Sequence, residues 1–117
     1  MNGIEWLIEA FECSDKATRE LPALESLFTT IVSNMALRPV GNPLWHRFPS
    51  GGGVTGIWLL QESHLTVHTF PEYRSACVNI FCCRPRQPLD WLKTFEGILG
   101  ATEVRVREHQ RIYRRDD

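Results

Sequence analysis

The stretch from His64 to Phe70 constrains the fold most strongly, because its residues alternate in the way that a half-buried β-strand does. Side chains of a strand point to alternate faces of the sheet. One face of this strand therefore carries His64, Thr66, His68 and Phe70, and the other carries Leu65, Val67 and Thr69. The strand is expected to end at Pro71, which has no amide hydrogen to donate to a neighbouring strand.

His64 and His68 have the spacing of a metal-binding pair on a helix. On a strand, however, four residues span about 13 Å at about 3.3 Å per residue. A zinc ion lies only about 2 Å from each of its nitrogen ligands. A single ion cannot bridge the two imidazoles, and no metal site is expected here.

The four cysteines form no CxxC pair, and two of them are adjacent. This pattern favours neither a zinc site nor a disulfide framework. Reduced and mostly buried thiols in a cytoplasmic protein are the expectation for Cys13, Cys77, Cys82 and Cys83.

The length of 117 residues predicts a single domain over residues 1–117 that can bury a core without disulfides or metals. Thirteen basic and fourteen acidic residues give a net charge of −1, which does not favour a nucleic-acid or membrane-surface partner. The chain has no apolar run of about 18 residues, so no transmembrane helix is expected. Its N-terminal segment also lacks the pattern of a signal peptide.

The remaining pattern predicts strands and two amphipathic helices around this central strand. Strands are expected over residues 4–13, 37–48 (with an interruption near Gly41), 54–60, 64–70, 77–83 and 102–109. The first helix follows the capping pair Ser14-Asp15, restarts at Pro22 and runs to Met35. The second helix covers residues 89–99, with Leu92 on its apolar face, and ends at Gly100.

The resulting order is β-α-β-β-β-β-α-β, which is typical of the α+β class. Short turns between consecutive strands predict an antiparallel sheet, with both helices packed on one face as a two-layer sandwich. The uncovered face of the sheet is available for a dimer contact.

Three runs of the sequence resemble the prokaryotic S-adenosylmethionine decarboxylase proenzyme family, and the resemblance covers roughly residues 3–110. The runs are Gly53-Val54-Thr55-Gly56, Glu62-Ser63-His64-Leu65-Thr66-Val67-His68-Thr69-Phe70-Pro71-Glu72 and Ala76-Cys77-Val78-Asn79-Ile80-Phe81-Cys82-Cys83. The resemblance implies self-cleavage between Glu62 and Ser63, which gives a β chain of residues 1–62 and an α chain of residues 63–117. Ser63 then becomes an N-terminal pyruvoyl group, which serves as the cofactor.

The cleavage follows from serine chemistry if the hydroxyl of Ser63 attacks the carbonyl of Glu62, which converts the peptide to an ester. Elimination splits the chain, and hydrolysis of the resulting dehydroalanine leaves the pyruvoyl ketone. That ketone forms an imine with the amine of the substrate and draws electrons from the bond to the carboxylate, as pyridoxal phosphate does.

Further roles are implied by the resemblance alone. His68 assists processing, Thr55 supplies a hydroxyl nearby, and Cys83 protonates the product at carbon. Glu72 holds the ribose hydroxyls, and Phe48 stacks on the adenine, although core packing explains Phe48 equally well. The members of the family form homodimers of processed protomers and supply an aminopropyl donor for spermidine synthesis.

Several positions differ from the family pattern. Glu5 and Trp6 stand where members often have His-Leu, Asn79 stands where many have Asp, and Arg84 stands where Gly follows the cysteine. These differences concern the choice of substrate more than processing, because Ser63, His68 and Cys83 are all present.

Two alternatives therefore stay open beside S-adenosylmethionine decarboxylation. A pyruvoyl-dependent ornithine or arginine decarboxylase would use Glu5 or Glu9 to pair with the amine or guanidinium of its substrate. A catalytically dead homologue would act as a regulatory partner and would stay uncut. For both glutamates, salt bridges or exposure to solvent explain the side chains without any substrate.

Overall fold

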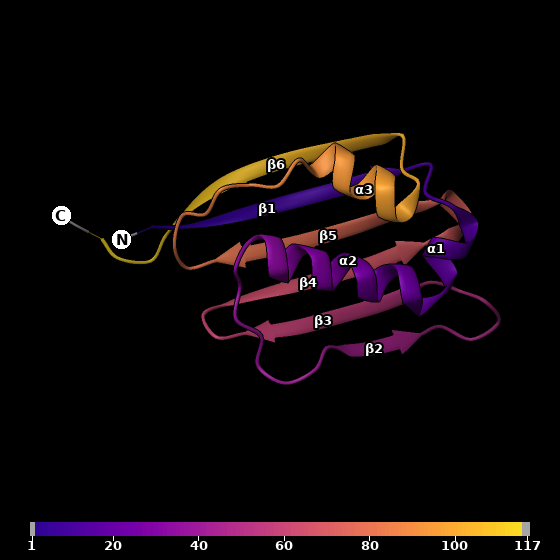
Figure 1. Ribbon diagram of the computed structural model, residues 1–117, viewed down its shortest axis with the longest axis horizontal. Helices are drawn as coiled ribbons and strands as arrows, with labels where there is room; N and C mark the ends of the chain where they lie inside the picture. The colour runs from indigo at the N-terminus through magenta and orange to yellow at the C-terminus, as the bar shows by residue number, and fades with distance from the viewer. Residues whose placement is uncertain (1, 116–117) are drawn as a thin grey trace.

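The computed structural model describes residues 2–115, and within them a six-stranded antiparallel sheet carries three α-helices on one face (Figure 1). The strands are β1 Asn2–Phe11, β2 Leu44–Arg47, β3 Val54–Leu60, β4 Ser63–Phe70, β5 Ser75–Cys82 and β6 Glu103–Ile112. The helices are α1 Asp15–Arg19, α2 Leu21–Asn34 and α3 Trp91–Leu99, with a 3-10 turn, η1, at Pro71–Tyr73. The predicted α+β class and antiparallel sheet are confirmed.

The strands lie in the order β2-β3-β4-β5-β1-β6, so the first strand is inserted between two later ones. β4 occupies the interior of the sheet and pairs with β3 on one side and β5 on the other. The expected end of β4 at Pro71 is also confirmed, because β4 stops at Phe70. The strand that carries the Glu62-Ser63 motif is thus fixed along both edges.

Helix boundaries follow the capping residues of the sequence. The expected restart occurs at Glu20, whose extended backbone ends α1 and precedes α2, with Pro22 in the first turn of α2. α3 begins at Trp91 because the side chain of Asp90 accepts a hydrogen bond from the backbone nitrogen of Lys93.

The predicted apolar face of α3 is wrong at Leu92, which is 48% exposed. Trp91, Phe95 and Leu99 are spaced four residues apart and bury one stripe of the helix against the sheet. Leu92 falls outside this stripe because it lies one residue, about 100° around the helix, from Trp91.

The long strand expected over residues 37–48 is also shorter than predicted. Only β2 forms, together with an isolated bridge between Pro39 and Leu60. Gly41 adopts a φ of +69° and Pro43 has no amide hydrogen, so the ladder cannot continue through them.

One apolar core lies between the helices and the sheet. Trp6, Ile8 and Ala10 contribute to it from β1, and Leu65 and Val67 contribute from β4. Alternate residues of the same strands face the other side of the sheet, which none of the helices described within residues 2–115 covers (Figure 1).

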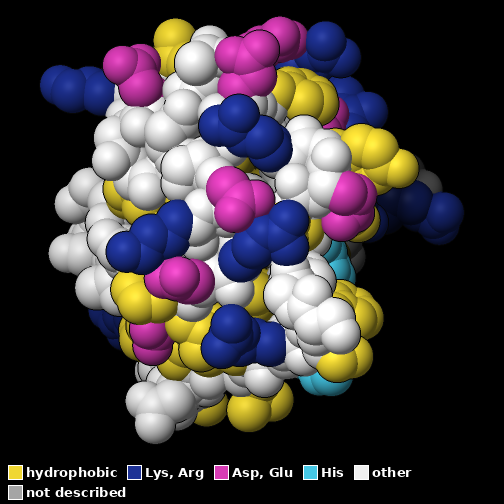
Figure 2. Space-filling view, turned by 90° about the vertical axis from the view of Figure 1, so that its right-hand side faces the viewer, with side chains coloured by type: hydrophobic (Ala, Val, Ile, Leu, Met, Phe, Trp, Pro, Cys, Tyr) yellow, Lys and Arg dark blue, Asp and Glu magenta, His cyan; other side chains and the backbone are white. Residues whose placement is uncertain are grey.

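This uncovered face changes in character across the sheet. Near β2 and β3 it exposes Leu44, Ile57 and Leu59, whereas β1 and β6 present ion pairs between Glu9 and Arg107 and between Glu5 and Arg111. At the end of the molecule seen in Figure 2, charges of both signs are interspersed, and histidines lie with hydrophobic side chains along one side. No helix within residues 2–115 has the length and apolar character needed to cross a bilayer.

Candidate active site

The Glu62–Ser63 peptide bond lies at the end of a tight hairpin. Leu60 pairs with Ser63, so Gln61 and Glu62 alone form the turn between β3 and β4. Neither Gln61, Glu62 nor Ser63 has a positive φ, and the backbone at the bond is therefore not in the left-handed region. Glu62 is exposed and Ser63 is half-buried, so surrounding side chains can approach the bond.

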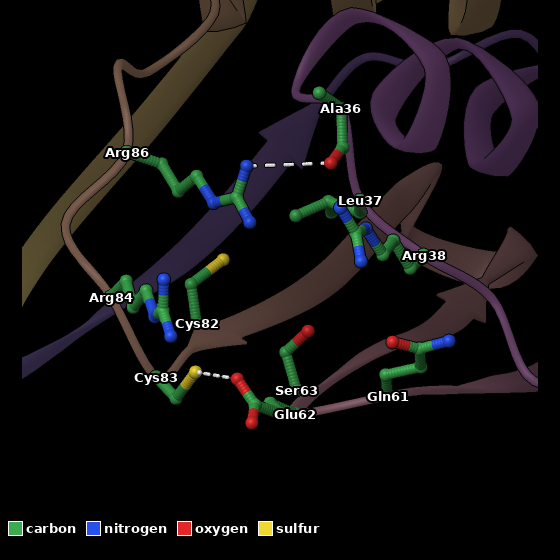
Figure 3. A pocket seen from close by; sticks show the side chains of 10 residues that line it. All are labelled: Ala36, Leu37, Arg38, Gln61, Glu62, Ser63, Cys82, Cys83, Arg84 and Arg86. Carbon is green, nitrogen blue, oxygen red and sulfur yellow. Dashed lines mark hydrogen bonds between the residues drawn. The ribbon is translucent and has the colours of Figure 1, made fainter.

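A cavity of about 380 Å³ opens beside this bond. It is lined by Ala36, Leu37, Arg38, Gln61, Glu62, Ser63, Cys82, Cys83, Arg84 and Arg86. Ser63 and Cys82 are register partners on β4 and β5, and the hydroxyl of Ser63 points into the cavity (Figure 3). Three arginines approach the same space from the segment after α2 and from the segment after β5.

Cys83 lies directly against the scissile residue. Its thiol donates a hydrogen bond to Oε2 of Glu62 over 3.0 Å, and this bond raises the pKa of Cys83 above its ordinary value. The hydroxyl of Tyr113 donates to the backbone carbonyl of Cys83 over 2.8 Å, which ties the end of β6 to this position. Cys83 is therefore held as a protonated thiol beside the carboxylate of Glu62.

Cys82 points to the opposite face of the sheet from Cys83. It is 2% exposed, and burial raises its pKa to about 11. All four cysteines of the chain are free thiols. Cys82 thus lies on the same face of the sheet as its register partner Ser63 and lines the cavity with it, while Cys83 contacts the side chain of Glu62.

Thr55 and His68 form a second cluster, on the uncovered face of the sheet. They are register partners on β3 and β4, and Thr55 Oγ1 lies 3.2 Å from Nδ1 of His68. His68 is five residues from Ser63 on one strand, a separation of about 17 Å at about 3.3 Å per residue. A single protomer therefore does not bring His68 to Ser63.

Glu5 belongs to a hydrogen-bonded network on the same face. Its carboxylate accepts a bond of 2.8 Å from Nδ2 of Asn79 and another from Arg111. Oδ1 of Asn79 in turn lies 2.9 Å from Nε2 of His64. These contacts, the bond from Asn79 first, lower the pKa of Glu5, so its carboxylate is ionised and already has two donors.

Phe48 and Glu72 lie apart from Ser63 in sequence and are both exposed. Phe48 is 51% exposed and packs edge-on against His46, with ring centroids 5.0 Å apart, so it is not a core residue. Glu72 lies in η1, just beyond the end of β4 that carries His68.

Sequence reasoning missed the arginines of the cavity and Tyr113. Arg84 could have been found because it follows Cys83 directly, but nothing in the sequence connects Arg38 or Tyr113 to Ser63. Among the residues that the structure describes, no group of three or more His, Cys, Asp or Glu side chains is placed to hold a metal ion.

Comparison with known proteins gives concordant results. The family model of S-adenosylmethionine decarboxylase matches residues 4–112. A proenzyme of that name from Prochlorococcus marinus is 33% identical over 115 residues, which is 95% of this chain and 88% of the relative. The Saccharolobus solfataricus proenzyme of the same name is 29% identical over 104 residues, 86% of this chain and 80% of the relative.

The fold also matches a solved structure. The crystal structure of the adenosylmethionine decarboxylase from Aquifex aeolicus superposes with a TM-score of 0.80 at 19% sequence identity. The match covers 98% of this chain and 94% of that one. At this identity the likeness concerns the fold.

Proposed function

The chain belongs to the S-adenosylmethionine decarboxylase family, and from this premise we propose that it is a self-processing, pyruvoyl-dependent enzyme that decarboxylates S-adenosylmethionine. The product would be the aminopropyl donor for spermidine synthesis. The convergence of Ser63, Glu62 and Cys83 at one cavity is the observation that carries the proposal. Residues that line this cavity would then supply the nucleophilic hydroxyl, the carbonyl that it attacks and the acid.

Ser63 fits the pyruvoyl group that the family implies, because its hydroxyl lies at the cavity and next to an exposed peptide bond. A pyruvoyl group at this position supplies an electron-withdrawing ketone that lets the carboxylate of a bound amino acid leave as CO₂. Cys83 would deliver the proton that replaces the carboxylate, because its bond to Glu62 holds the thiol proton in place.

Cleavage after Glu62 would not separate the two fragments. Fragment 1–62 provides β1, β2 and β3, and fragment 63–117 provides β4, β5 and β6. The sheet order alternates between them, since β4 pairs with β3 and β1 lies between β5 and β6. The processed protomer is thus proposed to remain one domain.

We propose further that the enzyme is a homodimer with active sites shared between protomers. Thr55 and His68 lie about 17 Å along the strand from Ser63, too far to act on it within one chain. Two uncovered faces packed about a two-fold axis, about 10 Å apart, would bring this cluster of one protomer close to the turn of the other that carries the Glu62–Ser63 bond. The exposed apolar residues of β2 and β3 support such a contact.

In this arrangement His68 transfers protons during processing, oriented by Thr55. Phe48 and Glu72 would bind the adenine and the ribose, respectively. Both are exposed, as a surface that meets substrate and partner requires, and Glu72 follows the strand that carries His68.

The ornithine or arginine alternative receives less support from the structure. It requires a carboxylate that pairs with the cationic end of the substrate, but Glu5 already accepts from Asn79 and Arg111. Glu9 accepts from Arg107 over 3.1 Å. The carboxylates that this alternative would use to bind its substrate are therefore already paired with other side chains of the protein.

Intact mass under denaturing and reducing conditions tests the processing. We expect two species, residues 1–62 and residues 63–117 with a pyruvoyl end, while Ser63→Ala stays full length. Release of CO₂ from carboxyl-labelled S-adenosylmethionine, compared with labelled ornithine and arginine, tests the substrate. A wild-type chain that remains uncut would contradict the proposal and favour the regulatory homologue.

The shared site has its own test. Ser63→Ala and His68→Ala are each expected to be inactive as purified homodimers. If the two variants are co-expressed, mixed dimers contain one site with both native residues, and partial decarboxylase activity should return. No recovery in verified mixed dimers would contradict a site built from two protomers.

A further inference from the structure

The cavity beside Ser63 carries more positive than negative charge. Its lining includes three guanidinium groups, those of Arg38, Arg84 and Arg86, and a single carboxylate, that of Glu62. Figure 3 shows the side chain of Arg38, from the segment after α2, and those of Arg84 and Arg86, from the segment after β5, around the space into which the Ser63 hydroxyl points. An excess of cations at one place raises the local affinity for an anion.

Arg86 has a structural partner in the uncut chain. Its Nη1 donates to the carbonyls of Met35 and Ala36 over 3.2 and 3.3 Å, at the end of α2. The side chains of Arg38 and Arg84 make no hydrogen bond or salt bridge to any residue between positions 2 and 115. These two guanidinium groups are available to an anion that the uncut chain does not contain.

We propose that Arg38 and Arg84 bind the α-carboxylate of Glu62 as self-cleavage releases it, and that they stabilise its negative charge while it leaves Ser63. This inference rests on the self-processing proposed above and assigns two further residues to it. The ligand of the arginines is the new C-terminus of fragment 1–62.

The charge arises at a defined step. The Ser63 oxygen first attacks the Glu62 carbonyl, the peptide C–N bond breaks, and the hydroxyl proton passes to the nitrogen. A base then removes the Cα proton of Ser63, and the Cβ–Oγ bond breaks. Glu62 departs as a carboxylate that keeps the serine oxygen, and residue 63 becomes dehydroalanine. Water adds to its imine tautomer and ammonia leaves, which gives the ketone.

Electrostatics explain why this step needs cations. The leaving α-carboxylate develops on Glu62, whose side-chain carboxylate lies at the same place and accepts the thiol of Cys83. Two negative charges on one residue repel each other, and cations fixed in advance offset the repulsion in the transition state.

The test compares Arg38→Gln, Arg84→Gln and the double variant with wild type, all purified quickly and incubated at neutral pH. Hydroxylamine cleaves an ester between Glu62 and Ser63 and leaves a hydroxamate on fragment 1–62, but it does not cleave the peptide. We expect each glutamine variant to complete cleavage about 10-fold more slowly. An ester that hydroxylamine cuts should accumulate, most strongly in the double variant.

Two controls separate charge from folding. Arg38→Lys with Arg84→Lys keeps both positive charges and should restore most of the rate. Lys93→Gln removes one positive charge from an exposed position on α3, away from the cavity, and should cleave like wild type.

Three results would overturn the inference. Wild-type cleavage rates in the double glutamine variant would show that the arginines do not act. Slow cleavage without an ester would place their effect before the leaving step. Failure of the lysine variant to recover would show that charge is not the cause. If wild-type protein never cleaves, the proposed function itself fails, and this result is visible before any variant is made.

Discussion

The substitution Asn79→Asp exchanges one side-chain nitrogen for oxygen, and it should have the largest effect on the free energy of unfolding that can be calculated from the structure. In the structure the side-chain nitrogen of Asn79 donates to Glu5 over 2.8 Å, while its oxygen meets the ring of His64 at 2.9 Å. Asn79→Asp would replace the donor with a second carboxylate at hydrogen-bond distance from the ionised Glu5. Many relatives are expected to carry Asp at this position. The loss of stability caused by Asn79→Asp in this chain should therefore depend on the neighbouring Glu5.

The size of this effect follows from the geometry. Two carboxylates whose charge centres lie about 4 Å apart repel by about 4 kcal/mol at an effective dielectric constant near 20. Loss of the hydrogen bond to an ionised group costs a further 1.5–3 kcal/mol or so. The guanidinium of Arg111 offsets part of this sum. We expect a net loss of about 3 kcal/mol in the free energy of unfolding, or about 10 °C in Tm.

Urea denaturation at pH 7.5 measures the loss, with Ser63→Ala as the background so that one unbroken chain unfolds. The matched rescue is Glu5→Gln with Asn79→Asp, in which the introduced glutamine amide would donate to the new carboxylate. The double variant should regain most of the stability. Falling pH protonates one of the paired carboxyls, so the deficit of Asn79→Asp should shrink below about pH 5.

Either of two outcomes would refute this reasoning. Asn79→Asp with wild-type stability at pH 7.5 would show that the two carboxylates do not meet. A double variant no more stable than Asn79→Asp alone would show that the loss has another cause.

Three further predictions concern the site and its support. Glu62→Gln in the Ser63→Ala chain removes the carboxylate that raises the pKa of Cys83, so alkylation of Cys83 should begin at lower pH. Peptide mapping measures the alkylation as a function of pH, and an unchanged pH dependence would contradict the contact between Cys83 and Glu62. Thr55→Val should slow processing about 5-fold, because it removes a hydrogen bond worth about 1 kcal/mol. Intact mass measured over time gives the rate, and an unchanged rate would show that Thr55 does not take part in processing. Gly56→Ala should lower the free energy of unfolding, measured by urea denaturation, by about 1–3 kcal/mol, because the added Cβ would lie 2.2 Å from the Trp45 ring. Wild-type stability would show that this ring moves freely.

The sequence was sufficient to predict the secondary structure wherever the hydrophobic periodicity and the proline and glycine residues indicated the same boundaries. Alternation and Pro71 defined β4, and Pro22 and Gly100 marked helix boundaries that the structure has. The expectation failed at residues 37–48, where short apolar segments did not reveal that Gly41 and Pro43 leave only β2 in the sheet. It also failed at Leu92, because only packing selects which side of a short helix is buried.

Sequence and tertiary structure also contributed different parts of the candidate site. Glu62, Ser63 and Cys83 were predicted from the sequence, because a long motif sets Glu62 and Ser63 directly before one predicted strand and Cys83 at the end of another. The structure adds that Cys83 donates to Glu62, that His68 and Thr55 form a separate cluster, and that Glu5 is engaged by Asn79 and Arg111.

The sequence by itself determined the residue types, the strand that carries them and the face to which each side chain points, because these depend on local periodicity. Only the tertiary structure decided which side chains meet. Arg38 and Arg84 are 46 positions apart, and they line one cavity because the segment after α2 and the segment after β5 pass the same end of the sheet, next to the turn between β3 and β4. Contacts of this kind depend on strand order and loop path, which local sequence does not encode.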